Sequence, residues 1–338
     1  MVYGAIDLHT RHSEIRIIDG DGRVIREGRI ATTRERLIAS VADVGHIRIL
    51  LEAGTESEWV AGALEGAGHE VIVADPNYAP MYGDRRRRIK TDRRDVAALA
   101  EANRHGWFRR AYRRSAAQRT IQQQLTSRTA LVQMRTKTIS VIRSLVRQEG
   151  YRIPSGRAAL IPARLDALAF PVALQQRLAP LCRTVAQLTA EILGIETALE
   201  ATADADPIVQ QLQTVPGVGL IVALMFRAFI DTIARFGTAA QVSAALGLVP
   251  REDSSAERRL RGHITKAGPS ALRSILVQAA WACWRSKRSG TLHAWVEGVA
   301  HRRGRRIAVV ALARRLSRIL FAIWRDGTVF QPAVLAAA

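Results

Sequence analysis

The first 75 residues alternate between short apolar segments and amphipathic segments, and this order restricts the folds open to the chain. The pattern predicts three strands in a meander at residues 3–7, 13–18 and 23–28, then a helix at 34–44, a strand at 47–51, a helix at 57–66 and a strand at 70–74. Asp19-Gly20-Asp21-Gly22 suits a tight hairpin turn between the second and third strands. A mixed α/β domain is therefore expected at the N-terminus.

Four acidic residues lie at strand ends or at a helical spacing in the first 95 residues. Asp7 ends the first strand, Glu52 ends the fourth, and Asp92 and Asp95 lie three apart in the segment 90–95. A carboxylate at a strand end can reach into a cleft while the strand stays packed, and residues three apart share one face of a helix. Four carboxylates on a rigid scaffold can hold Mg²⁺ or Mn²⁺ against a phosphate. With the element order, they indicate a ribonuclease H-like α/β fold.

Other acids compete for these positions. Glu52 is preferred for the second position because it terminates an apolar strand, but four nearby acids stay open as alternatives: Glu56, Glu58, Asp75 and Asp84. Asp92 and Asp95 taken alone also fit an ordinary helix with Arg–Asp pairs.

The charge of the chain indicates a polyanionic partner. Its 50 Lys and Arg outnumber 30 Asp and Glu, for a formal charge of +20, and DNA or RNA is the partner that such an excess attracts. A run of cations directly before the paired aspartates is expected to face phosphate: Arg85, Arg86, Arg87, Arg88 and Lys90. The ordinary alternative is a solvated basic loop in a ribosomal-type or merely soluble basic protein.

Cysteine content and hydropathy bear on localisation. Cys182 and Cys283 provide neither a disulfide framework nor a cysteine-based zinc pattern. No segment offers the roughly 18 uninterrupted apolar residues of a membrane span. We therefore expect a cytoplasmic, nucleoid-associated protein with no membrane partner.

The middle of the chain carries a heptad pattern. Apolar residues step by four and three over more than three heptads, at Leu174, Leu178, Leu181, Val185, Leu188, Ile192, Ile195 and Leu199. The predicted partner is a helix at residues 116–148, where Leu125, Val132, Ile139 and Val146 repeat every seven. This predicts a coiled coil, within one chain or between two, and favours self-association. An amphipathic helix on a globular core is the alternative.

The last third contains two segments suited to phosphate. Gly217 and Gly219 lie in a Gly-rich hairpin whose backbone N–H groups can approach phosphate closely, although a plain helix start explains the segment almost as well. Ser254 and Ser255 are predicted in a polar loop among arginines that include Arg261, which could orient a phosphodiester for an attacking hydroxyl. Turn chemistry or helix capping is the usual reason for such serines. Lys266 and Arg273 follow as further candidate nucleic-acid-binding residues.

Several motifs, taken in order, carry a family resemblance. They are Gly4-Ala-Ile-Asp7, Leu51-Glu52-Ala53-Gly54, Lys90-Thr91-Asp92-Arg93-Arg94-Asp95, Pro216-Gly217-Val218-Gly219, Gly247-Leu248-Val249-Pro250, Ile264-Thr265-Lys266-Ala267-Gly268 with Leu272-Arg273, Arg302-Arg303-Gly304-Arg305-Arg306 and the stretch from Ala308 to Arg314. Together they resemble the DEDD transposases of the insertion-sequence one-hundred-and-ten class. The resemblance covers nearly the whole chain.

The resemblance implies three domains. They are a RuvC-like catalytic domain at residues 1–112, a coiled-coil region at 113–205 and a mostly α-helical C-terminal transposase domain at 206–338. It implies that Asp7, Glu52, Asp92 and Asp95 are the metal ligands and that a serine is the nucleophile. The family's nucleophile stands in a Ser-Gly pair; here the aligned pair is Ser255-Ala256, and Ser254 stays open.

The implied activity is RNA-guided DNA recombination for insertion-sequence mobility. Strand cleavage and exchange would pass through a phosphoserine, with donor and target DNA and a bridge RNA as partners. Family members are thought to combine serine and carboxylates from different protomers in a dimer, or in a tetramer in the synaptic complex. Three alternatives stay open: a Holliday-junction resolvase-like nuclease that uses water, an actin-like sugar kinase or ATPase, and a structural RNA-binding protein.

Overall fold

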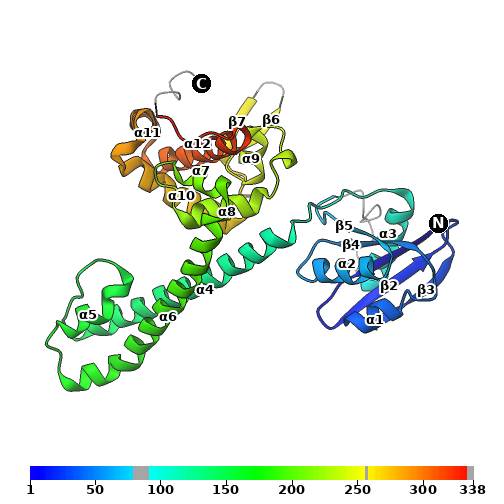
Figure 1. The fold of residues 1–338 in the computed structure, drawn as a ribbon, viewed down its shortest axis with the longest axis horizontal. Helices are drawn as coiled ribbons and strands as arrows, with labels where there is room; N and C mark the ends of the chain where they lie inside the picture. Colours follow the sequence, from blue (N-terminus) through cyan, green and yellow to red (C-terminus); the bar gives the residue numbers. More distant parts are fainter. Residues whose placement is uncertain (79–90, 256–257, 333–338) are drawn as a thin grey trace. The chain divides into compact units, whose positions relative to one another are not determined.

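The computed structural model describes residues 1–78, 91–255 and 258–332, and for residues 252–255 and 258–261 it describes the backbone alone. The chain divides into two compact units, residues 1–113 and 114–338 (Figure 1). The helices of the described ranges include none with the length and apolar character needed to cross a bilayer.

The first unit is built on a five-stranded sheet in the order β3-β2-β1-β4-β5. The strands are β1 (Val2–Asp7), β2 (His12–Ile18), β3 (Val24–Ala31), β4 (Ile47–Glu52) and β5 (Glu70–Ala74). β1, β2 and β3 form an antiparallel meander, whereas β4 is parallel to both β1 and β5. The predicted element order is confirmed. The hairpin at Asp19 is also confirmed, since its carboxylate accepts hydrogen bonds from the backbone N–H groups of Asp21 and Arg23.

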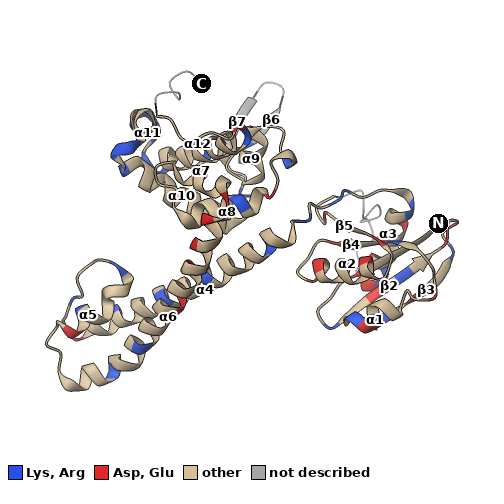
Figure 2. Cartoon of the chain, in the orientation of Figure 1, with Lys and Arg blue, Asp and Glu red and all other residues tan. Residues whose placement is uncertain are grey.

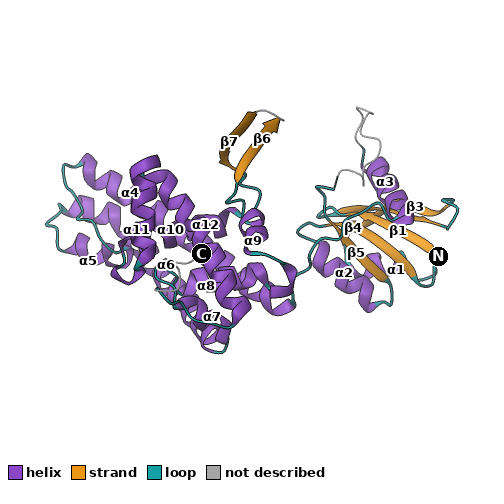
Figure 3. Cartoon of the chain, turned by 90° about the horizontal axis from the view of Figure 1, so that it is seen from above, coloured by secondary structure: helices purple, strands orange, loops and turns teal. Residues whose placement is uncertain are grey.

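Helices cover both faces of this sheet (Figure 3). α1 (Arg34–Ala39) and α2 (Ser57–Gly66) pack on one face, and α3 (Asp92–His105) packs on the other. α1 is shorter than the predicted helix at 34–44. It ends at Ala39 because the Ser40 side chain bonds back to the carbonyl of Leu37 and the chain then turns towards Gly45, whose φ is 69°.

A buried asparagine fastens α3 to the sheet. The Asn103 amide donates to the carbonyls of Gly4 (2.8 Å) and Arg48 (2.7 Å), while its Oδ1 accepts from Arg48 Nε (2.9 Å). Asn103 is fully buried. Its hydrogen bonds tie the C-terminal end of α3 to β1 and β4, and thereby fix where the N-terminal end of the helix lies.

We expect Asn103→Ala to destabilise the protein by about 3 kcal/mol, because two carbonyls and one guanidinium N–H would lose their buried partner. Urea unfolding followed by circular dichroism measures this change. Asn77→Ala is the matched control: Asn77 is exposed, so its loss should cost less than about 1 kcal/mol. Equal effects of the two substitutions would contradict an anchoring role for Asn103.

The second unit opens with two long helices, α4 (Ala116–Gln148) and α6 (Val172–Asp204), which lie side by side with α5 (Ile161–Asp166) near their far ends (Figure 1). The heptad residues Leu174, Leu178, Val185, Ile192 and Leu199 are buried. Arg128 of α4 pairs with Glu196 of α6 at 2.5 Å. The predicted pairing of these two helices is confirmed within one chain; supercoiling and self-association stay predictions.

The rest of the unit is mostly helical, as predicted. Its elements are α7 (Pro207–Gln213), α8 (Leu220–Ile230), α9 (Ala239–Ala245), β6 (Pro250–Ser255), β7 (Arg258–Ile264), α10 (Ser270–Arg285), α11 (Thr291–Arg303) and α12 (Arg305–Asp326). β6 and β7 pair as an antiparallel hairpin. The prediction of a polar loop at Ser254 and Ser255 is therefore wrong, because both residues belong to β6, opposite Arg259 and Arg258.

Candidate metal and nucleic-acid site

The carboxyl ends of β1 and β4 bring Asp7 and Glu52 to the same edge of the sheet. The parallel ladder pairs Ile6 with Leu51, so Asp7 and Glu52 are the next residues along neighbouring strands. Adjacent strands lie about 4.8 Å apart, and side chains alternate between the faces. Ala5 and Leu50 pack under α3, whereas Ile6 and Leu51 pack on the opposite face. Asp7 and Glu52 therefore fall on the α3 face.

The first turn of α3 brings two further acids to this face. Asp92 and Asp95 lie at the helix N-terminus, where the backbone N–H of Asp95 donates to the carbonyl of Thr91. Negative charge is favourable there because of the helix dipole, which offers an ordinary reason for both residues. That reason does not extend to Asp7, which belongs to a strand.

Three ligand atoms converge at the centre of this arrangement. Asp7, His9 and Asp92 each place one ligand atom within 4.8 Å of the other two. His9 Nε2 is 3.5 Å from Asp7 Oδ2 and 3.7 Å from Asp92 Oδ2. The Asp7 side chain is 19% exposed and that of Asp92 is 60% exposed. Two carboxylates and an imidazole at this spacing fit a divalent metal, and carboxylate oxygens favour Mg²⁺ or Mn²⁺.

Glu52 and Asp95 are not members of that 4.8 Å group among the described residues. They stand on the elements that carry it, Glu52 beside Asp7 in the ladder and Asp95 one helical turn from Asp92. The ends of β1 and β4 and the first turn of α3 thus carry the four predicted acids. The tightest group joins two of them with a histidine.

The competing acids have structural partners. Glu56 accepts from the Trp59 indole and Glu58 pairs with Arg113. Asp75 accepts from the backbone N–H of Asn77 and pairs with Arg109, and these contacts lower its pKa. They explain the three acids without a metal. Asp84 and the predicted phosphate-binding run of Arg85, Arg86, Arg87, Arg88 and Lys90 lie outside the described residues.

Our sequence reasoning missed His9. A signal was present, because His9 lies two residues after Asp7 and alternate residues of an extended chain share a face. Its proximity to Asp92 had no local signal, since that contact depends on how α3 packs on the sheet.

The hairpin that carries Ser254 and Ser255 is anchored by close backbone packing. Gly247 has a φ of 66°, and a Cβ there would lie 2.5 Å from the backbone N of Ala267. A Cβ on Gly268 would lie 2.1 Å from the carbonyl O of Ala245. Only glycine allows these approaches, which explains the glycines of both flanking motifs. The base of the hairpin is therefore held firmly against the end of α9.

Three predicted nucleic-acid-binding residues lie at or near this hairpin. Arg273 donates to the carbonyls of Gly268 (2.8 Å) and Leu246 (3.2 Å), so its guanidinium has a structural use. Lys266 is exposed and has a φ of 56°, a rare backbone conformation for a residue with a side chain. Arg261 belongs to β7, where the structure describes the backbone alone. Nucleic-acid contacts of all three stay predictions.

The Gly-rich segment forms the loop between α7 and α8. A Cβ on Gly217 would lie 2.3 Å from the carbonyl O of Ala279, so this glycine is required for packing against α10. Gly219 is exposed and stands at the N-terminus of α8. Packing thus supplies a reason for Gly217, and phosphate binding by either glycine stays a prediction.

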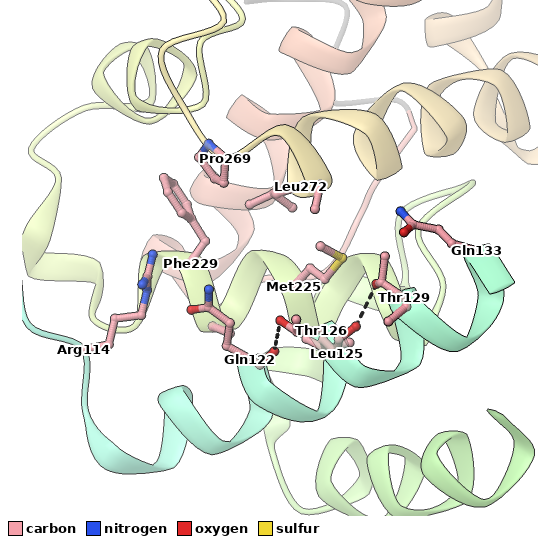
Figure 4. Close-up of a pocket in the computed structure, with 13 residues that line it drawn as sticks. Arg114, Gln122, Leu125, Thr126, Thr129, Gln133, Met225, Phe229, Pro269 and Leu272 are labelled. Carbon is pink, nitrogen blue, oxygen red and sulfur yellow. Dashed lines mark hydrogen bonds between the residues drawn. The ribbon is translucent and has the colours of Figure 1, made fainter. Parts of the chain in front are cut away.

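A pocket of about 250 Å³ opens in the second unit between α4, α8 and α10 (Figure 4). Leu125, Met225, Phe229 and Leu272 make its wall mainly apolar. The hydroxyls of Thr126 and Thr129 donate to carbonyls of their own helix. The pocket includes none of the predicted site residues.

Comparison with known proteins decides between the candidate families. Residues 5–150 match the model of a DEDD transposase domain, and residues 209–294 match the model described as "Transposase IS116/IS110/IS902 family". A probable family 20 transposase of Pseudomonas aeruginosa is 30% identical over 294 residues, which cover 84% of this chain and 86% of that protein. The chain belongs to the IS110 family of DEDD transposases.

Two further relatives agree with this assignment. The transposase for insertion sequence element IS1111A of Coxiella burnetii is 30% identical over 90% of this chain and 85% of its own length. The IS1328 transposase of Yersinia enterocolitica is 27% identical over 83% and 85%. As an enzyme that cleaves DNA and transfers strands, this transposase is neither a sugar kinase nor a purely structural RNA-binding protein. The DEDD match also fits a ribonuclease H-like fold for the five-stranded unit.

Proposed function

We propose that this transposase recombines DNA through two groups of residues, acids that hold metal at the end of the sheet and Ser255 on the β6–β7 hairpin. Asp7, Glu52, Asp92 and Asp95 form the acidic group, with His9 as a further ligand. The observation that carries the proposal is the convergence of Asp7, His9 and Asp92 within 4.8 Å, because the end of β1 and the start of α3, far apart in sequence, bring them together.

The acids have a defined role in this proposal. When bound, a divalent metal neutralises the phosphate and polarises its phosphorus towards attack. Asp7 holds its carboxylate rigidly because β1 is paired on both sides, by β2 and β4. Asp92 is more exposed and stands at a helix N-terminus, so it faces incoming DNA. The preference for Mg²⁺, or Mn²⁺, follows from the oxygen-rich ligand set.

Ser255 supplies the nucleophile. Its Oγ forms a bond to phosphorus while the bond to the leaving nucleotide oxygen breaks; the serine proton passes to solvent water, and the leaving oxygen takes up a proton from solvent water. The resulting phosphoserine conserves the phosphodiester for the exchange of strands. Ser254 is the alternative nucleophile. Close packing of Gly247 and Gly268 at the base of the hairpin supports a nucleophile on this hairpin, since a nucleophile must be held in one geometry.

Guidance and assembly complete the proposal. Residues 1–112 act as a RuvC-like catalytic domain, 113–205 as a coiled coil and 206–338 as the transposase domain. A bridge RNA pairs with donor and target DNA, and α4 and α6 join protomers into a dimer or a synaptic tetramer. The nucleic acids are held by cations and by the backbone of two glycines, Gly217 and Gly219. The cations are Arg85, Arg86, Arg87, Arg88, Lys90, Arg261, Lys266 and Arg273.

A metal-dependent nuclease with a water nucleophile is the second candidate. The observation that favours it is that Asp7, His9 and Asp92 all belong to the first unit, so the metal group needs no residue of the hairpin. A nuclease of this kind would cut DNA without a covalent protein–DNA intermediate.

We expect purified transposase that retains its copurified RNA to recombine donor and target plasmids only with Mg²⁺ or Mn²⁺ present. Chelation with EDTA, or ribonuclease treatment followed by inhibition of the ribonuclease, should each remove recombination. Sequencing of the product junctions measures the outcome. Metal-dependent cleavage without joined products would favour the nuclease, and recombination that survives ribonuclease would refute RNA guidance.

A further inference from the structure

The last 81 residues of the chain carry most of its net positive charge. Residues 258–338 contain sixteen Lys and Arg and only two acids, Glu297 and Asp326, a surplus of fourteen out of the formal +20. Both acids have partners. Glu297 accepts from the Trp284 indole at 2.7 Å, and Asp326 pairs with Arg325 at 2.7 Å. The surplus is therefore left to be neutralised by something outside the chain.

Part of this surplus gathers where α11 meets α12. The chain turns at Gly304, whose φ is 82°, and the four arginines around it are exposed. We call Arg302, Arg303, Arg305 and Arg306 the arginine corner. Within the described residues, none of the four has a carboxylate within 4.0 Å, and Figure 2 shows the concentration of Lys and Arg at the α11 end of this unit.

The helix dipole gives a structural reason for only two of the four arginines of the corner. Arg302 and Arg303 lie in the last turn of α11, where cations interact favourably with the helix dipole. Arg305 and Arg306 lie in the first turn of α12, where the dipole repels cations, and no acid stands in that turn. Gly304 provides no side-chain cap for the free N–H groups there. Two guanidinium groups at an uncapped helix start cost stability unless an anion joins them.

Neighbouring side chains hold the corner in place and extend it. The guanidinium of Arg305 lies over the rings of Trp284 (5.3 Å) and Trp281 (5.9 Å), which stack on each other with centroids 5.2 Å apart. This contact links the start of α12 to the end of α10. More exposed cations follow directly from the end of α10: Arg285, Lys287 and Arg288. Seven cations thus border a single corner.

We propose that the arginine corner binds the phosphate backbone of nucleic acid, as a contact separate from the acids and from the serine hairpin. α10 starts next to the anchored hairpin base at Gly268 and ends at the corner, and its 16 residues span about 24 Å. That length corresponds to about seven steps of 3.4 Å along one DNA strand. Arginine guanidinium groups can donate two hydrogen bonds to phosphate oxygens. Contacts of this kind with the backbone do not depend on base sequence.

The test measures binding and not recombination. Full-length Arg302→Gln/Arg303→Gln/Arg306→Gln transposase, freed of RNA, is titrated with a labelled DNA duplex and an RNA duplex of about 30 base pairs and arbitrary sequence over a salt series. Each lost phosphate contact should lower the slope of log K against log salt by about 0.9 on DNA. We expect the slope to fall by about 2 to 3 and affinity to drop about 10-fold or more. Arg305 is retained because it packs on the tryptophans.

The control removes the same charge elsewhere in the unit. Arg147→Gln/Arg152→Gln/Arg157→Gln changes three exposed arginines near the far ends of α4 and α6. An affinity change below about 3-fold here, with a clear loss at the corner, supports the proposal; equal losses in both variants would overturn it as a mere effect of net charge. If the triple variant folds poorly, the single Arg303→Gln variant takes its place and should lower the slope by about 1. An unchanged slope in that single variant would also overturn the proposal.

The two duplexes identify the source of the phosphate. A loss confined to DNA assigns the corner to DNA, a loss confined to RNA assigns it to the guide, and a loss on both assigns it to the shared backbone. The inference does not depend on the proposed chemistry. A slope that depends on the corner, found together with failed recombination, would refute only the proposed function.

Discussion

Ser255→Ala transposase is expected to lose strand transfer by about 10³-fold or more while it still binds RNA and DNA. The substitution removes the hydroxyl that we propose forms the covalent bond to phosphorus, and loss of a catalytic nucleophile has effects of at least this size. Denaturing gels with labelled DNA measure the protein–DNA adduct, and plasmid recombination measures the products. Both should vanish together.

Ser254→Ala is the matched control, one residue away on the same strand. It should keep the adduct and most of the recombination. If Ser254→Ala loses the adduct and Ser255→Ala keeps it, the nucleophile is Ser254. Cleavage that persists in both variants without any adduct would establish a water nucleophile.

Asp7→Asn is expected to reduce DNA cleavage by a similar factor, because it removes one ligand charge at the centre of the Asp7, His9 and Asp92 group. Asparagine keeps the size of the side chain, so the fold should survive. The readout besides activity is thermal unfolding over a Mn²⁺ series. Metal that binds only the folded protein raises the melting temperature with concentration, and Asp7→Asn should flatten that rise.

Asp75→Asn provides the matched control, since Asp75 directly follows strand β5 of the same sheet but is paired with Arg109. It should keep both the metal-dependent rise and cleavage. Its lowered pKa in the folded protein means that it stabilises the fold at neutral pH and loses that contribution as pH falls through the folded-state pKa, so a small loss of stability is expected. If the melting temperature of Asp75→Asn did not rise with Mn²⁺ while that of Asp7→Asn rose normally, the metal would bind at Asp75 and not at Asp7.

Much of the fold could be predicted from the sequence because its signals are local. Alternation of side chains defines the strands, and it also predicts that an acid ending an apolar strand will reach the end of the sheet. The heptad spacing of Leu174 to Leu199 likewise predicted both a long helix and its pairing. These patterns need only the geometry of one element.

The sequence did not show the roles that depend on contacts between elements. Gly217 was predicted to bind phosphate, which stays a prediction, and the approach of α10 to 2.3 Å of its Cβ position gives it a packing role that no local pattern indicated. Arg273 was predicted to contact nucleic acid, which also stays a prediction, and its guanidinium donates to two carbonyls of the chain. β6 extends to Ser255 because its partner strand β7 completes the ladder, even though the residues are polar.

The sequence by itself determined which residues are candidates for the chemistry: acids at strand ends and at a helix start, serines between arginines, and a basic C-terminal third. Only the tertiary structure decided that His9 joins Asp7 and Asp92, which are 85 positions apart in the sequence. The same holds for the arginine corner, whose two helices meet the end of α10. The physical reason is that strand and helix periodicity fix directions within an element, whereas distances between elements follow from how their apolar faces pack.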